Sequence, residues 1–390
     1  MKKGIKKIVA ALTATVIMMS SFQTTVIAKS VQMEATSSTE IAELTARLIE
    51  ADGTIPADFS QSDMDKFLKG ANPEVVAEIF DRIEKNLKPA TAEVSSLNSK
   101  TVPFTDCDSY SETYTEYIFD TGEVKTRYMK DDYFDTQKVR EKVTLQSSGT
   151  KLISPRAWPD YWFEQNPQNY YDTKATCRVI TKVKNSSDLY GGSGFLISGD
   201  TLVTASHNIY SPNYNGWCDY IVVIPSLSSS YQEGYYSYTT SSTVWIGNYY
   251  INQTYYRGDD WGVAKLKENF NITPFSLVSY GSQSHDDMWI RTQGYPVANS
   301  SIGADGQTLY LTTGEGYSRS NTSDYLKYGT SKVYTGMSGG PVLVKDSNNQ
   351  YYVAGIISGG VDASPYEWEI NNVVYVAFDT NLYNSIMSKI

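Results

Sequence analysis

The feature that most limits the fold of this chain is the succession of short apolar segments that follows Pro159. Clusters of Gly, Asn and Ser separate these segments, and helical periodicity is nearly absent until Thr380–Met387. Many short strands with frequent turn signals indicate a β-sandwich or β-barrels. Because the segments fall into two groups, we predict an all-β domain of two six-stranded antiparallel β-barrels, about residues 175–275 and 276–390, with a C-terminal helix. The candidate strands are 178–183, 194–197, 201–205, 221–224, 244–246, 261–266, 289–294, 308–312, 341–344, 353–358 and 373–377.

Charge and composition narrow the range of functions. The chain has 33 Lys and Arg residues against 43 Asp and Glu, a net charge of −10, whereas a nucleic-acid-binding protein needs a basic face. We therefore expect no nucleic-acid partner. The 32 tyrosines, with charged residues at only 19%, are typical of a β-rich extracellular protein. The chain has two histidines, His207 and His285, so any chemistry that depends on histidine has two candidates.

The first 28 residues have the layout of a secretory signal peptide. Four lysines within residues 2–7 precede the apolar run Ile8–Met19, and Ala28 supplies a small residue for cleavage. The apolar run is shorter than the ~20 residues that a membrane-spanning helix needs. We expect residues 1–28 to be removed and the protein to be secreted and extracellular, without stable membrane association.

Residues 29–156 differ from the strand-rich region that follows them. Three short helices are predicted within residues 39–88, and Asn72 is expected to cap the third of them. Residues 107–147 alternate aromatic and polar side chains around Thr121-Gly122, which indicates a β-hairpin. This part of the chain is therefore expected to form a small unit that is partly helical and partly β.

Three short motifs carry the chemistry. His207 ends the sequence Thr-Ala-Ser-His directly after a predicted strand, and Asp260 directly precedes the apolar strand 261–266. Ser338 lies in the sequence Gly-Met-Ser-Gly-Gly-Pro, where the glycines let backbone N–H groups point at a developing oxyanion. A serine hydroxyl is a weak nucleophile that needs a neighbouring base, and a histidine base needs a carboxylate to orient it. Each motif therefore supplies what the other two lack.

With these motifs in the order His, Asp, Ser, residues 160–390 resemble the chymotrypsin-fold (trypsin-like) serine proteases. The resemblance implies that Ser338 attacks the scissile carbonyl and that His207 takes and later returns the proton. Asp260 would orient the imidazole and stabilise its charged form. The implied function is a secreted serine endopeptidase that acts on protein or peptide substrates through an acyl-enzyme.

The same resemblance predicts the groups that bind the substrate. The N–H groups of Gly336 and Ser338 would form the oxyanion hole. The segment Ser358-Gly359-Gly360 resembles the strand that pairs with the substrate backbone, so Ser358 and Gly360 are predicted to bind substrate. Ser358 is also expected to lie near Asp260.

The turn Gly294-Tyr295-Pro296 resembles the bacterial glutamyl-endopeptidase branch of this family. That branch carries a histidine one position before the serine of the substrate-pairing strand, and Ile357 stands there in this chain. Val333, five residues before Ser338, likewise offers no hydroxyl, so a buried substrate carboxylate would have no partner. We therefore predict cleavage after small or medium apolar residues rather than after glutamate. A Lys332 ammonium directed into the pocket would reverse this preference.

Other catalytic classes fail on residue count. The Gly-x-Ser-x-Gly elbow of lipases and esterases needs a histidine after the serine, and none follows Ser338. Two histidines 78 positions apart (285 − 207), without a His-Glu-x-x-His motif, leave no catalytic metal site. No cofactor is expected, and a structural calcium ion is left open. The alternative that survives is a chymotrypsin-fold protein with a silent or very narrow site that acts as a secreted binding or toxin-like factor.

The three cysteines, Cys107, Cys177 and Cys218, are an odd number in an oxidising compartment. If maturation removes residues 29–156 as a pro-segment, Cys107 is discarded and one pair is left. We therefore predict a Cys177–Cys218 disulfide and a protease domain of residues 157–390. The pro-segment would be a partner of the protease domain before maturation, as a folding aid or an inhibitor.

Overall fold

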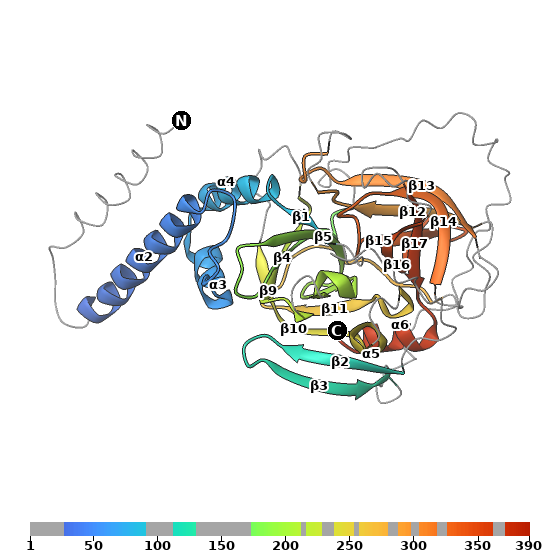
Figure 1. Ribbon diagram of the computed structural model, residues 1–390, viewed down its shortest axis with the longest axis horizontal. Coiled ribbons are helices and arrows are strands. Elements are labelled where there is room, and N and C mark those ends of the chain that lie inside the picture. Colours follow the sequence, from blue (N-terminus) through green and yellow to red (C-terminus); the bar gives the residue numbers. More distant parts are fainter. Residues whose placement is uncertain are drawn as a thin grey trace, which may run out of the picture.

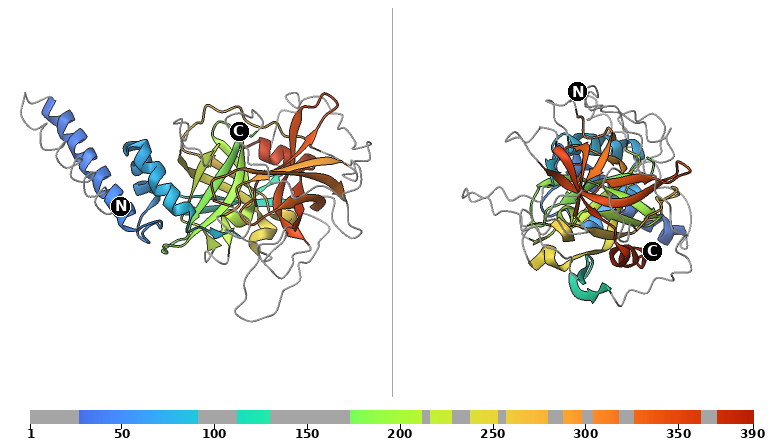
Figure 2. Two further views of the ribbon diagram at one scale, coloured as in Figure 1. Left: turned by 90° about the horizontal axis from the view of Figure 1, so that it is seen from above. Right: turned by 90° about the vertical axis from the view of Figure 1, so that its right-hand side faces the viewer.

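The structure, a computed structural model, describes residues 27–90, 112–129, 173–211, 216–227, 238–252, 257–279, 288–297, 304–317, 326–361 and 371–390. Two β-barrels lie side by side, and the N-terminal helices lie on the side of the first barrel that faces away from the second (Figures 1 and 2). Among the described residues, no helix is long and apolar enough to cross a membrane. This architecture confirms the predicted pair of antiparallel barrels.

Six strands form the first barrel. Their order is β11-β6-β5-β4-β9-β10, and pairing of β10 with β11 closes the barrel. Phe195 and Trp261 are fully buried in its apolar interior. The short strands β7 (Tyr210–Ser211) and β8 (Gly216–Trp217) pair with each other, and α5 (Asn248–Asn252) follows β10. The barrel strands are β4 (Thr176–Lys182), β5 (Leu189–Ser198), β6 (Thr201–Thr204), β9 (Tyr220–Pro225), β10 (Thr239–Gly247) and β11 (Gly262–Leu266).

The second barrel is also closed by six strands, in the order β12-β13-β14-β17-β16-β15. Helix α6 (Thr380–Met387) follows it and begins at the N-cap Asp379, whose side chain accepts a hydrogen bond from the Leu382 N–H at 2.8 Å. The C-terminal helix is therefore where the sequence predicted it. The strands are β12 (Trp289–Gly294), β13 (Tyr310–Tyr317), β14 (Leu326–Val333), β15 (Pro341–Lys345), β16 (Tyr351–Val361) and β17 (Asn371–Ala377).

Strand β14 was not among the candidate strands. Lys327, Gly329 and Lys332 break up its apolar pattern, so the segment reads as a loop in sequence. The strand forms because β13 and β17 flank it and supply its backbone hydrogen bonds. It leads directly into the turn that carries Ser338.

The predicted N-terminal helices are present. They are α2 (Ile27–Glu50), α3 (Gln61–Gly70) and α4 (Pro73–Glu84), and α2 begins earlier than the sequence indicated. The Asn72 side chain caps α4 by accepting the Glu74 N–H at 2.8 Å. After α4 the chain forms the two-residue strand β1 (Lys88–Pro89), which pairs in parallel with β5.

The predicted hairpin is present as β2 (Thr113–Ile118) and β3 (Glu123–Tyr128), with Gly122 in the left-handed region of φ at +69°. Strand β9 pairs with Thr239 and Thr240 at the start of β10, and β2 pairs with residues 243–247 further along the same strand. The hairpin therefore extends the sheet of the first barrel. Tyr114 and Tyr117 are buried in the core of that barrel. The hairpin is therefore packed as a part of the barrel.

The predicted Cys177–Cys218 disulfide is wrong for this structure, in which both thiols are buried and free. Cys177 lies opposite Pro225 at one end of the β4–β9 pair, whereas Cys218 precedes Tyr220, which lies opposite Lys182 at the other end. The offset from residue 177 to residue 182 is about 16 Å along a strand, and a disulfide needs Cα atoms within ~7 Å. The cysteine count alone contains no information about this register.

Candidate active site

The pairing of β6 with β11 brings His207 and Asp260 together. The strands are antiparallel with Thr204 opposite Gly262, so the residues after Thr204 and those before Gly262 lie at the same end of the pair. His207 Nδ1 is 2.8 Å from Asp260 Oδ2, and the His207 main-chain N–H donates to Asp260 Oδ1 at 3.1 Å. The Ser206 hydroxyl ties the two segments together by donating to the Trp261 carbonyl at 2.6 Å.

The Asp260 carboxylate is fully buried, and its acceptor capacity is used. Besides its two bonds with His207, it accepts a hydrogen bond from the Ser358 hydroxyl at 2.6 Å. Buried carboxylates are costly unless donors surround them, and these contacts supply such donors to Asp260. With a carboxylate as its neighbour, Nδ1 carries the proton, and Nε2 is left as the basic nitrogen. The expected proximity of Ser358 to Asp260 is confirmed.

Ser338 lies on a tight turn between β14 and β15, and glycines shape that turn. Gly336 and Gly339 have φ of +98° and +86°, a region that other residues rarely adopt. A Cβ at Gly339 would lie 2.1 Å from the Ser193 carbonyl oxygen. The backbone conformation of the turn therefore requires glycine at these two positions of the Gly-x-Ser-Gly-Gly pattern.

One residue of β5, Ser193, holds both sides of the Ser338 turn. Its main-chain N–H donates to the Ser338 carbonyl at 2.8 Å, and its hydroxyl donates to the Gly336 carbonyl at 2.8 Å. The same hydroxyl accepts the Tyr295 N–H at 2.8 Å. Ser193 thus links the first barrel to the turn and to the end of β12. Ser193 is not among the residues predicted from sequence, although it stands in the Gly-Gly-Ser-Gly segment before the histidine strand.

Asn208, directly after His207, is a second residue that sequence reasoning missed. It is fully buried, and its amide nitrogen donates to the Ser338 carbonyl at 3.0 Å and to Thr204 Oγ1 at 2.8 Å. A Cβ at Gly192 would lie 2.3 Å from its amide oxygen, so a glycine opposite it is required. Through Asn208 the histidine segment is joined to the main chain of the serine.

The predicted substrate-binding residues surround the other side of the turn. The Gly339 N–H donates to the Ile357 carbonyl at 2.7 Å, and the Ile357 N–H donates to the Gly340 carbonyl at 2.9 Å. The side chains of Ile357 and Val333 are buried in one cluster of the second barrel. Gly360 lies opposite Val373 in the β16–β17 pair.

Lys332 bonds to a neighbouring side chain, since its Nζ donates to Asn372 Oδ1 at 3.1 Å across the β14–β17 pair. His285, Cys107 and the expected end of the pro-segment at residue 156 lie outside the described residues. Within the described ranges, no group of three or more His, Cys, Asp or Glu side chains is arranged to hold a metal ion.

Two antiparallel barrels, a buried histidine–aspartate pair and a glycine-shaped serine turn between them define the class of two-barrel serine hydrolases. The family model for trypsin matches residues 167–380, and the chain belongs to the trypsin family. Ser338 is 8% exposed, whereas His207 and Asp260 are fully buried in the chain with its N-terminal segment in place.

Comparison with known proteins gives distant relatives. An extracellular metalloprotease of Bacillus subtilis (strain 168) is 28% identical over 211 residues, which cover 52% of this chain and 61% of that protein. The chain thus spans about three fifths of the length of that relative. A solved Glu endopeptidase in complex with MPD has 16% identity and a TM-score of 0.46, covering 59% of this chain and 97% of that one. The protease Anisep from Arthrobacter nicotinovorans has 14% identity and a TM-score of 0.45, covering 58% and 99%.

Proposed function

We propose that this chain is a secreted serine endopeptidase with His207, Asp260 and Ser338 as its catalytic triad. The observation that carries the proposal is the hydrogen-bonded His207–Asp260 pair, joined through Asn208 to the main chain of Ser338. A histidine whose tautomer is set by a carboxylate, on a segment joined to that of a serine, supports nucleophilic acyl transfer as the chemistry.

The reaction follows from these positions. His207 Nε2 removes the proton from the Ser338 hydroxyl as the serine oxygen attacks the scissile carbonyl, and Asp260 stabilises the imidazolium that forms. The imidazolium then protonates the leaving amine, so the peptide C–N bond breaks and an acyl-enzyme remains. A water molecule repeats the sequence on the ester, with His207 again as the base, and releases the acid product. The N–H groups of Gly336 and Ser338 would hold the carbonyl oxygen while it carries negative charge.

The competing function is a secreted binding or toxin-like protein with a silent site. Labelling with a fluorophosphonate distinguishes the two, because the reagent bonds only to a serine that a neighbouring base activates. We expect stoichiometric labelling of Ser338 in the processed protein, located by mass spectrometry of the labelled peptide. Absence of labelling in every processed form would favour the silent site.

Secretion and maturation belong to the same proposal. Residues 1–28 would direct export, and residues 29–156 would act as a pro-segment that is cut from the protease domain 157–390. The substrates are proteins or peptides, in keeping with the trypsin family to which the chain belongs.

For specificity, we predict that the enzyme cleaves after small or medium apolar residues. Ile357 and Val333 are apolar and offer no hydrogen-bond donor, and the Lys332 ammonium bonds to Asn372. A substrate carboxylate beside buried apolar side chains would lose its hydration without gaining a donor. A peptide library should therefore show cleavage after Ala, Val or Leu at least about tenfold more often than after Glu. Dominant cleavage after Glu or Asp would instead assign Lys332 as the cation that selects the substrate.

Replacing Ser193 with alanine should lower kcat by about ten- to a hundredfold while KM changes little. The substitution removes the hydroxyl that fixes the Gly336 carbonyl, and Gly336 belongs to the proposed oxyanion hole. Loss of a direct oxyanion donor costs about 10²–10³ in kcat, so a positioning residue should cost less. Ser198→Ala is the matched control, since Ser198 lies on the same strand and its hydroxyl bonds to Asp200. Equal kcat values for the two variants would contradict this role.

A further inference from the structure

The N-terminal helices and the first barrel share one hydrophobic core. Side chains of α3, α4 and the segment before them pack with residues of β4, β9 and the start of β5, and with residues of the second barrel near β12. Phe59, Phe67 and Tyr220 are fully buried in this shared core. Removing the helices would expose an apolar face that a folded domain rarely leaves in water. The barrel residues in the shared core include Ile180, Tyr220, Val222, Ile224 and Tyr295.

A buried ion pair fixes the helical unit to the barrel. Glu84, the last residue of α4, is 1% exposed, and Arg178 on β4 is 0% exposed. Arg178 Nη2 donates to Glu84 Oε2 at 2.8 Å, and Arg178 Nε donates to Glu84 Oε1 at 3.1 Å. The remaining nitrogen of the guanidinium, Nη1, donates to the Tyr295 carbonyl at 2.7 Å. Without Glu84 the buried charge of Arg178 would have no counter-ion, so the barrel is built to keep this carboxylate.

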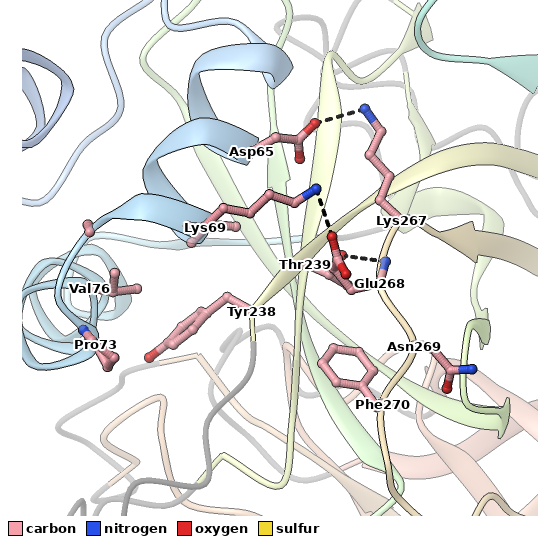
Figure 3. Close-up of a pocket in the computed structure, with 12 residues that line it drawn as sticks. Asp65, Lys69, Pro73, Val76, Tyr238, Thr239, Lys267, Glu268, Asn269 and Phe270 are labelled. Atoms are coloured by element: carbon pink, nitrogen blue, oxygen red, sulfur yellow. Dashed lines mark hydrogen bonds and ion pairs between the residues drawn. The ribbon is translucent and has the colours of Figure 1, made fainter. Parts of the chain in front are cut away.

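The rim of the interface is held by weaker contacts. Lys69 pairs with Glu268 at 2.8 Å and Lys267 with Asp65 at 2.8 Å, around a cavity of about 320 Å³ (Figure 3). The Lys69–Glu268 pair is more than half exposed on its lysine side, and exposed pairs contribute little to affinity. Retention of the helical unit therefore rests on buried contacts, which are the shared core, the Glu84–Arg178 pair and the hydrogen bond from Gln61 Nε2 to Thr240 Oγ1 at 3.2 Å.

The helical unit ends on the strand that holds the serine turn. In β1, Lys88 lies opposite Tyr190 and Pro89 opposite Gly191, and the Ala90 N–H donates to the Gly191 carbonyl at 3.1 Å. Gly191 is two residues before Ser193, whose N–H bonds to the Ser338 carbonyl. The chain at residues 88–90 thus pairs with the free edge of β5 next to the candidate active site.

That edge lies where the leaving part of a substrate would extend. The Ser338 turn is held between β5, through Ser193, and β16, through Ile357. If the acyl part of a substrate pairs with Ser358–Gly360 on β16, the part beyond the scissile bond runs past the turn toward β5. An extended peptide needs free backbone groups there, and β1 has taken them.

We propose that residues 41–90 form a docking unit that stays bound to the first barrel after the chain is cut, and that β1 keeps the protease latent by occupying the β5 edge at Tyr190 and Gly191. The latency half of this proposal rests on the proposed function, because it presupposes a working peptidase. The docking half concerns binding alone and can be tested on an inactive chain.

Docking is tested on the full secreted chain carrying Ser338→Ala, with a recognition site for a foreign site-specific protease placed within residues 92–99. After this cut, we expect the N-terminal fragment to co-elute with the rest of the chain in size-exclusion chromatography. Glu84→Gln should release the fragment at least about a hundredfold faster, because Arg178 keeps its charge without a counter-ion. The matched control is Glu78→Gln on the same helix, since Glu78 is 55% exposed and pairs with Arg82 one turn further along that helix. If Glu84→Gln hinders folding, a chain in which methionine replaces both Glu84 and Arg178 takes its place. This chain has no unpaired buried charge, so the fragment should again be retained.

Latency is tested on the same cut chain with Ser338 intact. Release of the fragment in the Glu84→Gln chain should raise hydrolysis of a peptide that extends past the scissile bond by at least about tenfold, and hydrolysis of a small ester by much less. Separation of the fragment from the cut Ser338→Ala chain during chromatography would overturn docking, and equally fast release from the Glu78→Gln and Glu84→Gln chains would overturn the role of Glu84. Peptide hydrolysis that is unaffected by the bound fragment would overturn latency. If no form is labelled by a fluorophosphonate, the proposed function fails, and retention in the Ser338→Ala chain still decides the docking unit.

Discussion

Replacing Ser338 with alanine is expected to lower the turnover number for peptide hydrolysis by about a million-fold, the scale found when a triad nucleophile is removed. The hydroxyl is the atom that forms the acyl-enzyme, so the covalent route is lost entirely. The turn itself should persist, because Ser193 and Asn208 bond to the carbonyl of residue 338 and not to its side chain. The variant should therefore fold normally and still bind peptides. A peptide-hydrolysis assay on the purified protein measures the loss of turnover.

Two histidine variants test the same assignment. His207→Ala should cost about as much as Ser338→Ala, because nucleophile and base act as one unit and their losses are not additive. His285→Ala is the control and should leave turnover nearly unchanged. If Ser338→Ala were as active as the unaltered protein, the triad assignment would be wrong.

The barrels could be predicted from sequence, and the triad could be proposed from it, because their signals are local. Each buried strand is a short apolar run bounded by turn residues, and that pattern reflects burial on a pleated sheet. The three motifs are also local, since each catalytic side chain must sit at a strand end or on a tight turn. The order of the motifs along the chain then links them, because only His207 precedes both an aspartate at the start of a strand and a serine on a glycine-rich turn.

The remaining features depend on contacts between distant segments, which local patterns do not contain. Asn208 and Ser193 matter because their partners lie 130 and 143 residues away, at Ser338 and Gly336. Strand β14 forms because the neighbouring strands pair with it, although its own sequence is partly polar. The positions of Cys177 and Cys218 depend on strand register, and the cysteine count could not supply it.

The Glu84–Arg178 pair is a further example of long-range placement. Its members are 94 residues apart, and in sequence each reads as an ordinary surface charge on a helix or a strand. Only the docking of α4 on β4 buries them together. The predicted division into pro-segment and protease domain stays a prediction, and the shared core explains why cutting the chain between them need not separate them.

Asp260→Asn is expected to lower kcat by about 10⁴-fold with little change in KM. The reason lies in the donors around the carboxylate. The His207 main-chain N–H can only donate, so the amide oxygen must take the Oδ1 position. The amide nitrogen then takes the Oδ2 position, 2.8 Å from His207 Nδ1, and the Ser358 hydroxyl can rotate to accept its second hydrogen.

An amide N–H directed at Nδ1 forces the imidazole proton onto Nε2, the nitrogen that must accept the Ser338 proton. The variant would therefore keep its fold and its substrate affinity while holding the base in the wrong tautomer. Ser358→Ala is the matched control, because it removes one donor to Asp260 but leaves the carboxylate to fix the tautomer, and it should cost only about ten- to a hundredfold. Steady-state kinetics on the two purified variants measures the difference. A loss in Asp260→Asn no greater than in Ser358→Ala would mean that Asp260 serves the packing of the site and not the tautomer of His207.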